Sequence, residues 1–430
     1  MHQYHYDNTT TKIPTESENP NKMNKVTNDI LYIGINDYQT DLFESQYPVK
    51  NGVTYNSYVI LDEKIMVIAT TSHDFNDAWM ANVAAALDSR KPDYLLIQHM
   101  EPDHSATIAE FMNAYPDTTI AASKGALNMI KNYFGTDYPG HNLVIKEGDI
   151  LSLGRHELSF LAAPMVHWPE VMFAYDSTDK VLFSADAFGR FGAPLDPSLD
   201  AVSPEYEAEE WLPEARRYYI GIVGKHGDPV QKVLAKAAGL DIQIICALHG
   251  PVLTRDLGKY IDVYMKWATY TPEQKGIAIC YTSVYGHTRE AAEYLAYTLK
   301  ELYKGIHHCD RHQAGELEIK LFDLARSDVS EATAAAFQYD RLVLATTTYN
   351  NDIFPVMRGF IDHLKYSAFQ NRTVGFMENG SWGPKAAGVM KGLLDDCPNL
   401  TYCGTTVTIK SALQDDSKAQ IAELAKELLQ

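Results

Sequence analysis

The sequence predicts two α/β domains, the second of which is a doubly wound parallel sheet. The chain has 430 residues, which at roughly 150 residues per domain suggests more than one folding unit. Short apolar runs bounded by Gly, Pro, Asp or Asn recur from residue 28 to residue 270, and strands and helices then alternate regularly from residue 276 onward. Such alternation is typical of a parallel sheet with helices on both faces.

This change in the pattern of strands and helices divides the sequence into three regions. We expect a disordered extension over residues 1–27, a first domain over residues 28–271 and a second domain over residues 275–430. The extension is polar and has no apolar stretch of the kind that a secretory signal requires. The run Thr271-Pro272-Glu273-Gln274-Lys275 reads as a linker.

The individual elements are predicted from short apolar runs and from helical patterns. In the first domain the expected strands are Tyr58–Leu61, Ile65–Ala69, Tyr94–Gln98, Leu158–Ala162, Val181–Ser184 and Gln243–Ala247. In the second domain the expected strands are Gly276–Tyr281, Glu318–Phe322, Arg341–Ala345 and Thr373–Met377. The expected helices there are Thr288–Tyr303, Glu331–Phe337, Arg358–Leu364 and Ser417–Leu429.

Charge and cysteine content exclude several classes of protein. Lys and Arg number 37 and Asp and Glu 56, so the net charge is 37 − 56 = −19, which disfavours nucleic acid and anionic membranes as partners. No apolar run approaches the ~20 residues of a membrane-spanning helix. The five cysteines form no C-x-x-C pair, which argues against a disulfide framework and against a thiolate metal site. We therefore expect a soluble, cytoplasmic protein.

A dense group of metal-ligating residues follows the predicted strand Tyr94–Gln98. The segment His99-Met100-Glu101-Pro102-Asp103-His104 has four candidate ligands in six residues, and we expect Pro102 to block helix formation there. A single buried His is more often a satisfied core residue, but four such groups together are costly without a cation. Three more candidates stand at the ends of apolar strands, and the full set is His99, Glu101, Asp103, His104, His167, Asp186 and His249.

This ligand set favours two redox-active metals. Seven ligands with one bridging carboxylate give each of two metals four protein contacts. Imidazole and carboxylate without thiolate suit Fe or Mn and would also hold Zn. Three carboxylates nearly balance two divalent ions and suit ions that also reach the trivalent state, so we favour a diiron site over a dizinc site.

Three loops at the carboxyl ends of the second domain's strands predict a cofactor pocket. Ligands bind at that edge of open parallel sheets, and hydroxyls and backbone N–H groups at a helix start can cradle a phosphate. No Walker motif and no G-x-G-x-x-G motif is present, so no resident nicotinamide cofactor is expected. Taken alone, the first loop could be a simple helix cap and Trp382 a surface aromatic. The candidate residues are Thr282, Ser283, Val284, Tyr285, Gly286, His287, Thr288, Thr347, Thr348, Tyr349, Asn350, Asn351, Gly380, Ser381, Trp382 and Gly383.

Both halves resemble the flavodiiron proteins, also called A-type flavoproteins. The resemblance rests on His99-x-Glu101-x-Asp103-His104, His167-Trp168-Pro169, Ser184-Ala185-Asp186 and Leu248-His249-Gly250, and on three loops similar to those of flavodoxin. It implies an αββα metallo-β-lactamase-like sandwich followed by a flavodoxin-like doubly wound sheet that binds FMN. Zinc hydrolases of the same fold usually carry His at the place of Glu101.

The resemblance also implies a site assignment and an activity. One iron would take His99, Glu101 and His167, the other Asp103, His104 and His249, and Asp186 would bridge them. FMN would pass electrons to the iron pair, which would reduce O₂ to water or NO to N₂O. The expected partners are a redox protein such as rubredoxin with its NADH-dependent reductase, and a second copy of the chain in a head-to-tail homodimer or a dimer of dimers.

Two rival functions stay open at this point. The first is a dizinc hydrolase of the metallo-β-lactamase fold, in which the flavodoxin-like half is only a tether. The second is an electron carrier whose first domain has lost its metal. Arg358, Lys365 and Lys385 are candidate docking cations by their sequence proximity to the flavin loops, and each is either a docking residue for the donor or ordinary surface charge. The chain has no cysteine pair for a fused rubredoxin, so we expect the donor to be external.

Overall fold

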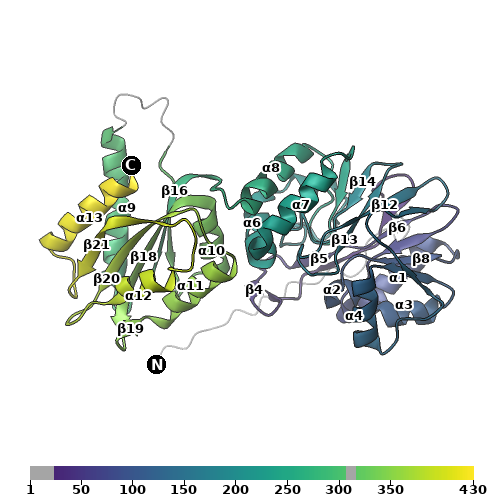
Figure 1. Ribbon diagram of the computed structural model, residues 1–430, viewed down its shortest axis with the longest axis horizontal. Coiled ribbons are helices and arrows are strands. Elements are labelled where there is room, and N and C mark those ends of the chain that lie inside the picture. The colour runs from purple at the N-terminus through teal and green to yellow at the C-terminus, as the bar shows by residue number, and fades with distance from the viewer. Residues whose placement is uncertain (1–23, 307–315) are drawn as a thin grey trace.

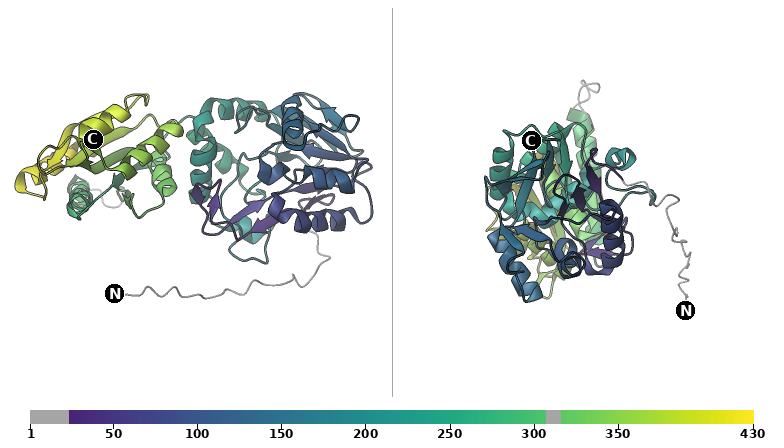
Figure 2. Two further views of the ribbon diagram at one scale, coloured as in Figure 1. Left: turned by 90° about the horizontal axis from the view of Figure 1, so that it is seen from below. Right: turned by 90° about the vertical axis from the view of Figure 1, so that its right-hand side faces the viewer.

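The computed structural model describes residues 24–306 and 316–430, which form two α/β domains joined end to end (Figure 1). The first domain runs from residue 24 to the end of helix α8 (Leu257–Ala268), and the second begins with strand β16 (Gln274–Tyr281). The left view of Figure 2 shows the two domains next to each other, and in the right view, along the long axis, one lies behind the other. Within the described residues, no helix is long and apolar enough to cross a membrane.

The first domain consists of two sheets packed face to face with helices on both outer faces. The first sheet contains, in spatial order, β1 (Ile30–Tyr32), β6 (Tyr58–Ile60), β7 (Met66–Ile68), β8 (Tyr94–Ile97), β9 (Thr119–Ala122) and β10 (Asn142–Val144). The second contains β11 (Ile150–Ser152), β12 (Glu157–Ala162), β13 (Met172–Asp176), β14 (Val181–Phe183) and β15 (Ile244–Cys246). Together with the helices, these sheets form the expected αββα sandwich.

Alternation along the strands explains why both faces of each sheet are covered. In β13, Met172 and Ala174 belong to the core between the sheets, whereas Phe173 and Tyr175 pack outward with α8 and α7 (Gly227–Ala237). The outer face of the first sheet packs against the helices α1 (Asn76–Leu87), α3 (Ile108–Ala114) and α4 (Lys124–Phe134). Because side chains alternate between faces, fully apolar strands bury both sides, as a four-layer sandwich requires.

Smaller elements frame the edge of the sandwich that carries the metal-ligating residues. They are β2 (Ile35–Asp37), β3 (Leu42–Phe43), β4 (Tyr47–Pro48), β5 (Val53–Tyr55), η1 (His73–Phe75), α2 (Pro102–Ser105), α5 (Pro204–Ala208), α6 (Leu212–Tyr218), η2 (Tyr219–Val223) and η3 (Gly224–His226). The expectation that Pro102 blocks a helix is wrong, because it occupies the first turn of α2. At that position a helix has no hydrogen-bonding partner for the N–H that proline lacks.

The second domain is a five-stranded parallel sheet between two helical layers. The strands are, in spatial order, β17 (Ile319–Asp323), β16, β18 (Tyr339–Tyr349), β20 (Thr373–Asn379) and β21 (Thr401–Ile409), and the short β19 (Asp352–Ile353) pairs with β18. The helices are α9 (His287–Ile306), α10 (Val329–Gln338), α11 (Pro355–Tyr366), α12 (Ala386–Leu393) and α13 (Asp415–Leu428). Leu295 of α9 and Leu424 of α13 pack on one face of the sheet, and Ala335 of α10 and Phe360 of α11 lie on the other side. This is the expected doubly wound sheet.

One hydrophobic core extends through both domains. The same cluster contains Trp267 of α8 in the first domain and Phe337 of α10 in the second. Buried ion pairs reinforce this contact: Arg216 binds Glu273, and Nη1 of Arg217 lies 3.2 Å from Asp328. The linker is therefore short and packed, since α8 ends at Ala268 and β16 begins at Gln274.

The predicted strands and helices are all present, with ends shifted by a few residues. Of the expected extension 1–27, residues 1–23 lie outside the described residues, while Lys25 pairs with Leu31 in an isolated bridge. The sequence reasoning overlooked α12 and β21 in the second domain. In the first domain it overlooked the strands β1, β9, β10, β11 and β13, the helices α1, α3, α4, α7 and α8, and the small elements around the metal-ligating residues.

Candidate metal centre and cofactor pocket

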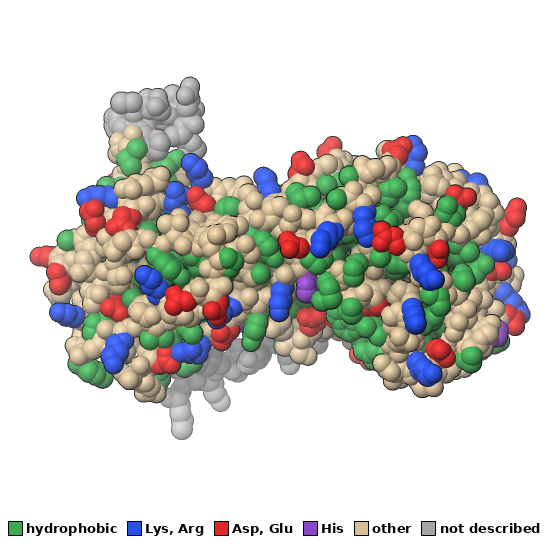
Figure 3. Space-filling model, viewed as in Figure 1, with side chains coloured by type: hydrophobic (Ala, Val, Ile, Leu, Met, Phe, Trp, Pro, Cys, Tyr) green, Lys and Arg blue, Asp and Glu red, His purple; other side chains and the backbone are tan. Residues whose placement is uncertain are grey.

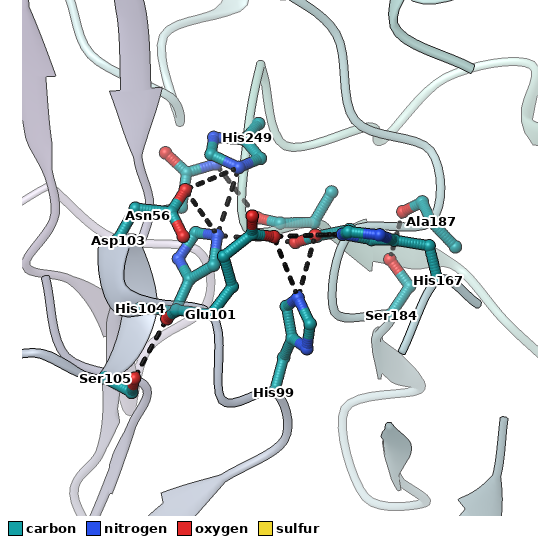
Figure 4. Close-up of polar contacts among 12 residues, drawn as sticks. Asn56, His99, Glu101, Asp103, His104, Ser105, His167, Ser184, Ala187 and His249 are labelled. Atoms are coloured by element: carbon teal, nitrogen blue, oxygen red, sulfur yellow. Dashed lines mark hydrogen bonds and ion pairs between the residues drawn. The ribbon is translucent and has the colours of Figure 1, made fainter. Parts of the chain in front are cut away.

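The seven predicted ligands come together at one edge of the sandwich, where several strands end (Figure 4). Four of them belong to the segment that follows β8, His167 lies in the loop between β12 and β13, Asp186 follows β14 and His249 follows β15. They form two groups, one of His99, Glu101, His167 and Asp186, and one of Asp103, His104 and His249. Positions far apart in the sequence converge because their strands end at the same edge.

Asp186 links the two groups through its two carboxylate oxygens. Its Oδ2 lies 3.4 Å from Nε2 of His99 and 3.2 Å from Nε2 of His167, whereas its Oδ1 lies 3.4 Å from Nε2 of His104. Ligands at about 2.1 Å from a metal are about 3.0–3.4 Å from one another, which matches these separations. One oxygen thus faces each group.

Four buried carboxylate oxygens of this cluster make no hydrogen bond within the described chain, which indicates that a cation fits there. Both carboxylate oxygens of Asp103 and of Asp186 are buried and make no hydrogen bond within the described chain. The Nε2 atoms of His104 and His249 face each other at 3.0 Å. Since unpaired buried carboxylates are costly, these donors fit a pair of metal ions.

Hydrogen bonds on the far side of two imidazoles fix their orientation. Nδ1 of His99 lies 2.9 Å from Oε1 of the buried Glu170, and Nδ1 of His249 lies 2.7 Å from the backbone oxygen of Thr54. With Nδ1 donating to these oxygens, Nε2 carries the lone pair that a metal needs. The sequence reasoning missed Glu170, although it stands three residues after His167.

Without a metal, His167 holds a proton beside the carboxylates. Burial lowers the pKa of His167, but the close carboxylates of Asp186 and Glu101 outweigh this effect and raise the pKa to about 9. Burial raises the pKa of Glu101, but the hydrogen bonds from His167 and His99 outweigh this effect, so the pKa of Glu101 is lowered. Protons therefore supply positive charge at this site in the absence of a metal, and a metal that binds must displace them.

Two further titratable side chains lie beside the cluster. Burial and the charge of Glu101 raise the pKa of Glu44 to about 7. Burial and the charge of Asp186 raise the pKa of Tyr218, whose buried hydroxyl has no hydrogen-bond partner within the described chain. Sequence reasoning had no signal for either residue, since neither belongs to a recognisable spacing pattern.

The predicted cofactor loops surround a pocket of about 960 Å³ in the second domain. Its volume lies in the range of small-molecule sites. Fourteen of the sixteen predicted residues line it, and the other two support the first loop. Thr282 is buried against Thr346, and Gly286 has φ +98°, a conformation that favours glycine. Asn379, Lys385 and Ser411 also line the pocket and were not predicted.

The first loop of the pocket is built to hold an anion. It leads into the 20-residue helix α9, whose first turn presents unpaired N–H groups. The Ser283 hydroxyl accepts from the N–H of Gly286 at 3.0 Å, which tightens the loop. Two aromatic side chains at the pocket, Tyr285 and Trp382, are 91% and 96% exposed, so they are free to lie against a planar ring. The pocket therefore fits a flavin mononucleotide.

Comparison with known proteins identifies the family. Residues 53–250 match the family model "ODP family beta lactamase", and residues 277–415 match "NADPH-dependent FMN reductase". Anaerobic nitric oxide reductase flavorubredoxins from Salmonella paratyphi B and Escherichia coli O1:K1 are each 30% identical over 376 residues, or 86% of this chain and 75% of theirs. The chain belongs to the flavodiiron protein family.

Solved flavodiiron structures share the fold. Rubredoxin oxygen:oxidoreductase from Desulfovibrio gigas has a TM-score of 0.85 at 23% identity, covering 95% of this chain and 98% of that one. The flavodiiron protein from Giardia intestinalis also has a TM-score of 0.85, at 22% identity, covering 97% of this chain and 98% of that one. This flavodiiron protein is thus an oxidoreductase with FMN and a diiron centre as its cofactors, as the sequence predicted.

Proposed function

We propose that this protein reduces NO to N₂O and O₂ to water at a diiron centre held by the seven clustered residues. His99, Glu101 and His167 would bind one iron, Asp103, His104 and His249 the other, and Asp186 would bridge them. The observation that supports this most directly is the opposite orientation of the two Asp186 oxygens, one toward each group. When bound, the iron pair supplies the one-electron chemistry for both gases.

The surrounding residues would prepare the site and hold protons beside it. Glu170 and Thr54 orient His99 and His249 for metal binding. The Tyr218 hydroxyl is buried near three carboxylates and stays protonated at neutral pH, so it is available to donate a hydrogen bond to a small anionic or polar group. We include NO because the flavorubredoxins at 30% identity are named as nitric oxide reductases.

Electrons would reach the iron pair through FMN held by the three loops of the second domain. The metal cluster belongs to the other domain, so we propose a head-to-tail homodimer in which the flavin pocket of one chain faces the metal centre of its partner. The exposure of Tyr285 and Trp382 supports this arrangement, because a partner surface would cover both rings.

An external redox protein such as rubredoxin would supply the electrons. Two of the three candidate docking cations already have carboxylate partners, since Arg358 lies 2.6 Å from Asp352 and Lys365 lies 3.0 Å from Asp396, and neither lines the flavin pocket. Figure 3 shows acidic and basic side chains interspersed over the visible face of the second domain. A donor that docks on this face would therefore meet interspersed acidic and basic side chains, and Arg358 and Lys365 would not form an unpaired basic patch.

Parallel anaerobic stopped-flow measurements would test the function. The reduced protein should oxidise rapidly on mixing with NO and with O₂, and the same sample should contain two irons and one FMN per chain. Steady turnover with NADH alone should be slow and should accelerate when rubredoxin and its NADH-dependent reductase are added. Full-speed turnover on NADH alone would refute the external donor.

Metal analysis separates this proposal from the dizinc hydrolase. Zinc as the chief metal after iron-replete expression, together with failure to oxidise on mixing with either gas, would overturn the proposal. Glu101 favours iron here, because a carboxylate at that position adds negative charge that stabilises the trivalent state.

A further inference from the structure

Lys385 is distinctive among the residues around the flavin pocket. It is the one Lys or Arg among the pocket-lining residues of the described chain, and no Asp or Glu lines the pocket there. The pocket wall therefore carries a single fixed positive charge. Glu378, the nearest carboxylate in sequence, is engaged elsewhere, since it accepts from the N–H of Ala387 and from the hydroxyl of Thr408.

The contacts of Lys385 place it beside the second loop of the pocket. Its Nζ donates to Oδ1 of Asn351 at 2.7 Å, and its backbone N–H donates to the hydroxyl of Thr348 at 2.9 Å. Within the described chain it makes no hydrogen bond to the loop 282–288, the anion-holding loop at the start of α9. Lys385 is thus held by the second loop of the pocket and not by the anion-holding loop.

The position of Lys385 in its own helix is unfavourable on local grounds. It is the N-cap residue of α12, and its side chain makes no capping hydrogen bond. Ser, Thr, Asp and Asn are preferred at an N-cap, and a cation there opposes the helix dipole. A residue that is poor for the helix but directed at the Asn351 side chain of the pocket wall indicates a role in the pocket.

We infer that the Lys385 ammonium stabilises the reduced state of FMN and raises its reduction potential. The inference rests on the proposed binding of FMN by these loops. Two electrons from the donor and one proton from water convert oxidised FMN to the fully reduced form, which adds one negative charge to the ring system. A fixed cation on the ring side of the pocket favours that added charge, and the amide of Asn351 holds the ammonium in position. The positive charge of Lys385 thereby favours the transfer of electrons from the donor to FMN.

Redox titration of the intact holoprotein tests this inference. The midpoint potential of FMN is measured spectroscopically for the unsubstituted protein and for Lys385→Met, Lys385→Arg and Lys391→Met. The last variant removes an equal charge from the same helix outside the pocket lining. Lys385→Met should weaken binding of reduced FMN relative to oxidised FMN at least tenfold, which lowers the two-electron potential by about 30 mV. Lys385→Arg and Lys391→Met should change that ratio less than threefold.

A second measurement distinguishes the ring from the phosphate. The dissociation constant of oxidised FMN, followed by flavin fluorescence, should change less than threefold in Lys385→Met. The inference would be overturned by an unchanged midpoint potential in Lys385→Met, or by an equal fall in midpoint potential in Lys391→Met. Weaker binding of oxidised FMN by Lys385→Met, with the midpoint potential unchanged, would also overturn it. Failure of the unsubstituted apoprotein to bind FMN would instead overturn the flavin assignment itself.

Discussion

Replacing Glu170 by Ala should weaken iron binding by about 10- to 100-fold while leaving the fold intact. Oε1 of Glu170 accepts from Nδ1 of His99 at 2.9 Å and from the backbone N–H of Met100 at 2.8 Å. The substitution removes both hydrogen bonds and frees His99 to rotate. Hydrogen-bonding partners of metal-bound histidines typically contribute this range of metal affinity, equivalent to about 1.4–2.8 kcal/mol.

Competition with a chelator measures this effect. Apoprotein of the unsubstituted chain, Glu170→Ala and Glu170→Gln would each be titrated anaerobically with Fe²⁺ against a chromophoric chelator. Glu170→Gln keeps a neutral oxygen acceptor and should fall between the other two. Glu157→Ala, an exposed substitution in β12, is the matched control and should bind iron normally. Affinity of Glu170→Ala within twofold of the unsubstituted protein would refute the reasoning, provided that both apoproteins melt at similar temperatures.

Three further outcomes are expected. Asp186→Ala should lose most of its iron and its gas reduction but retain reducible FMN, measured by elemental analysis and flavin absorbance; near-normal turnover would show that Asp186 does not bridge. Because the pKa of His167 is raised to about 9 in the metal-free protein, the imidazole is protonated below that pH, so binding of Mn²⁺ at pH 7.5 should release protons. Calorimetry in two buffers of different ionisation enthalpy counts them, and a buffer-independent heat would contradict the expectation. Glu273→Ala, which breaks a buried pair with Arg216, should cost about 3–5 kcal/mol in urea unfolding, whereas Lys50→Ala, which breaks an exposed pair with Glu331, should cost less than about 1 kcal/mol. Equal losses of unfolding free energy in the two variants would contradict the expectation that the buried ion pair contributes more to stability than the exposed one.

Sequence reasoning found the seven clustered candidate ligands because strand ends converge. His167, Asp186 and His249 each follow an apolar run, and apolar runs that end in a polar residue predict both the strand and the rim position of that residue. The same reasoning could not find Glu170, Glu44 or Tyr218, since their proximity to the metal site depends on how loops and helix α6 pack at that edge of the sandwich. Lys385 was predicted only as a surface cation, because its place in the pocket depends on the start of α12, an element that the sequence pattern did not reveal.

Pro102 illustrates a limit of residue propensities. Proline disfavours helix interiors, so the pattern predicted irregular backbone around Asp103 and His104. In the structure the proline begins the short helix α2, which holds both side chains on one turn beside His249. The rule about proline was sound, but its consequence depended on where in the helix the proline fell.

The shared core between the domains bears on how the two halves of the protein can be separated. A fragment beginning at Gln274 would expose Ala332, Ala335 and Phe337, which the first domain helps to bury. It would also leave Arg372 without the backbone oxygen of Tyr270 that it binds at 2.7 Å. The flavin-binding half is therefore not an independent module like a free electron carrier, and the point in the sequence where the domains join is a poor site for dissecting or recombining them.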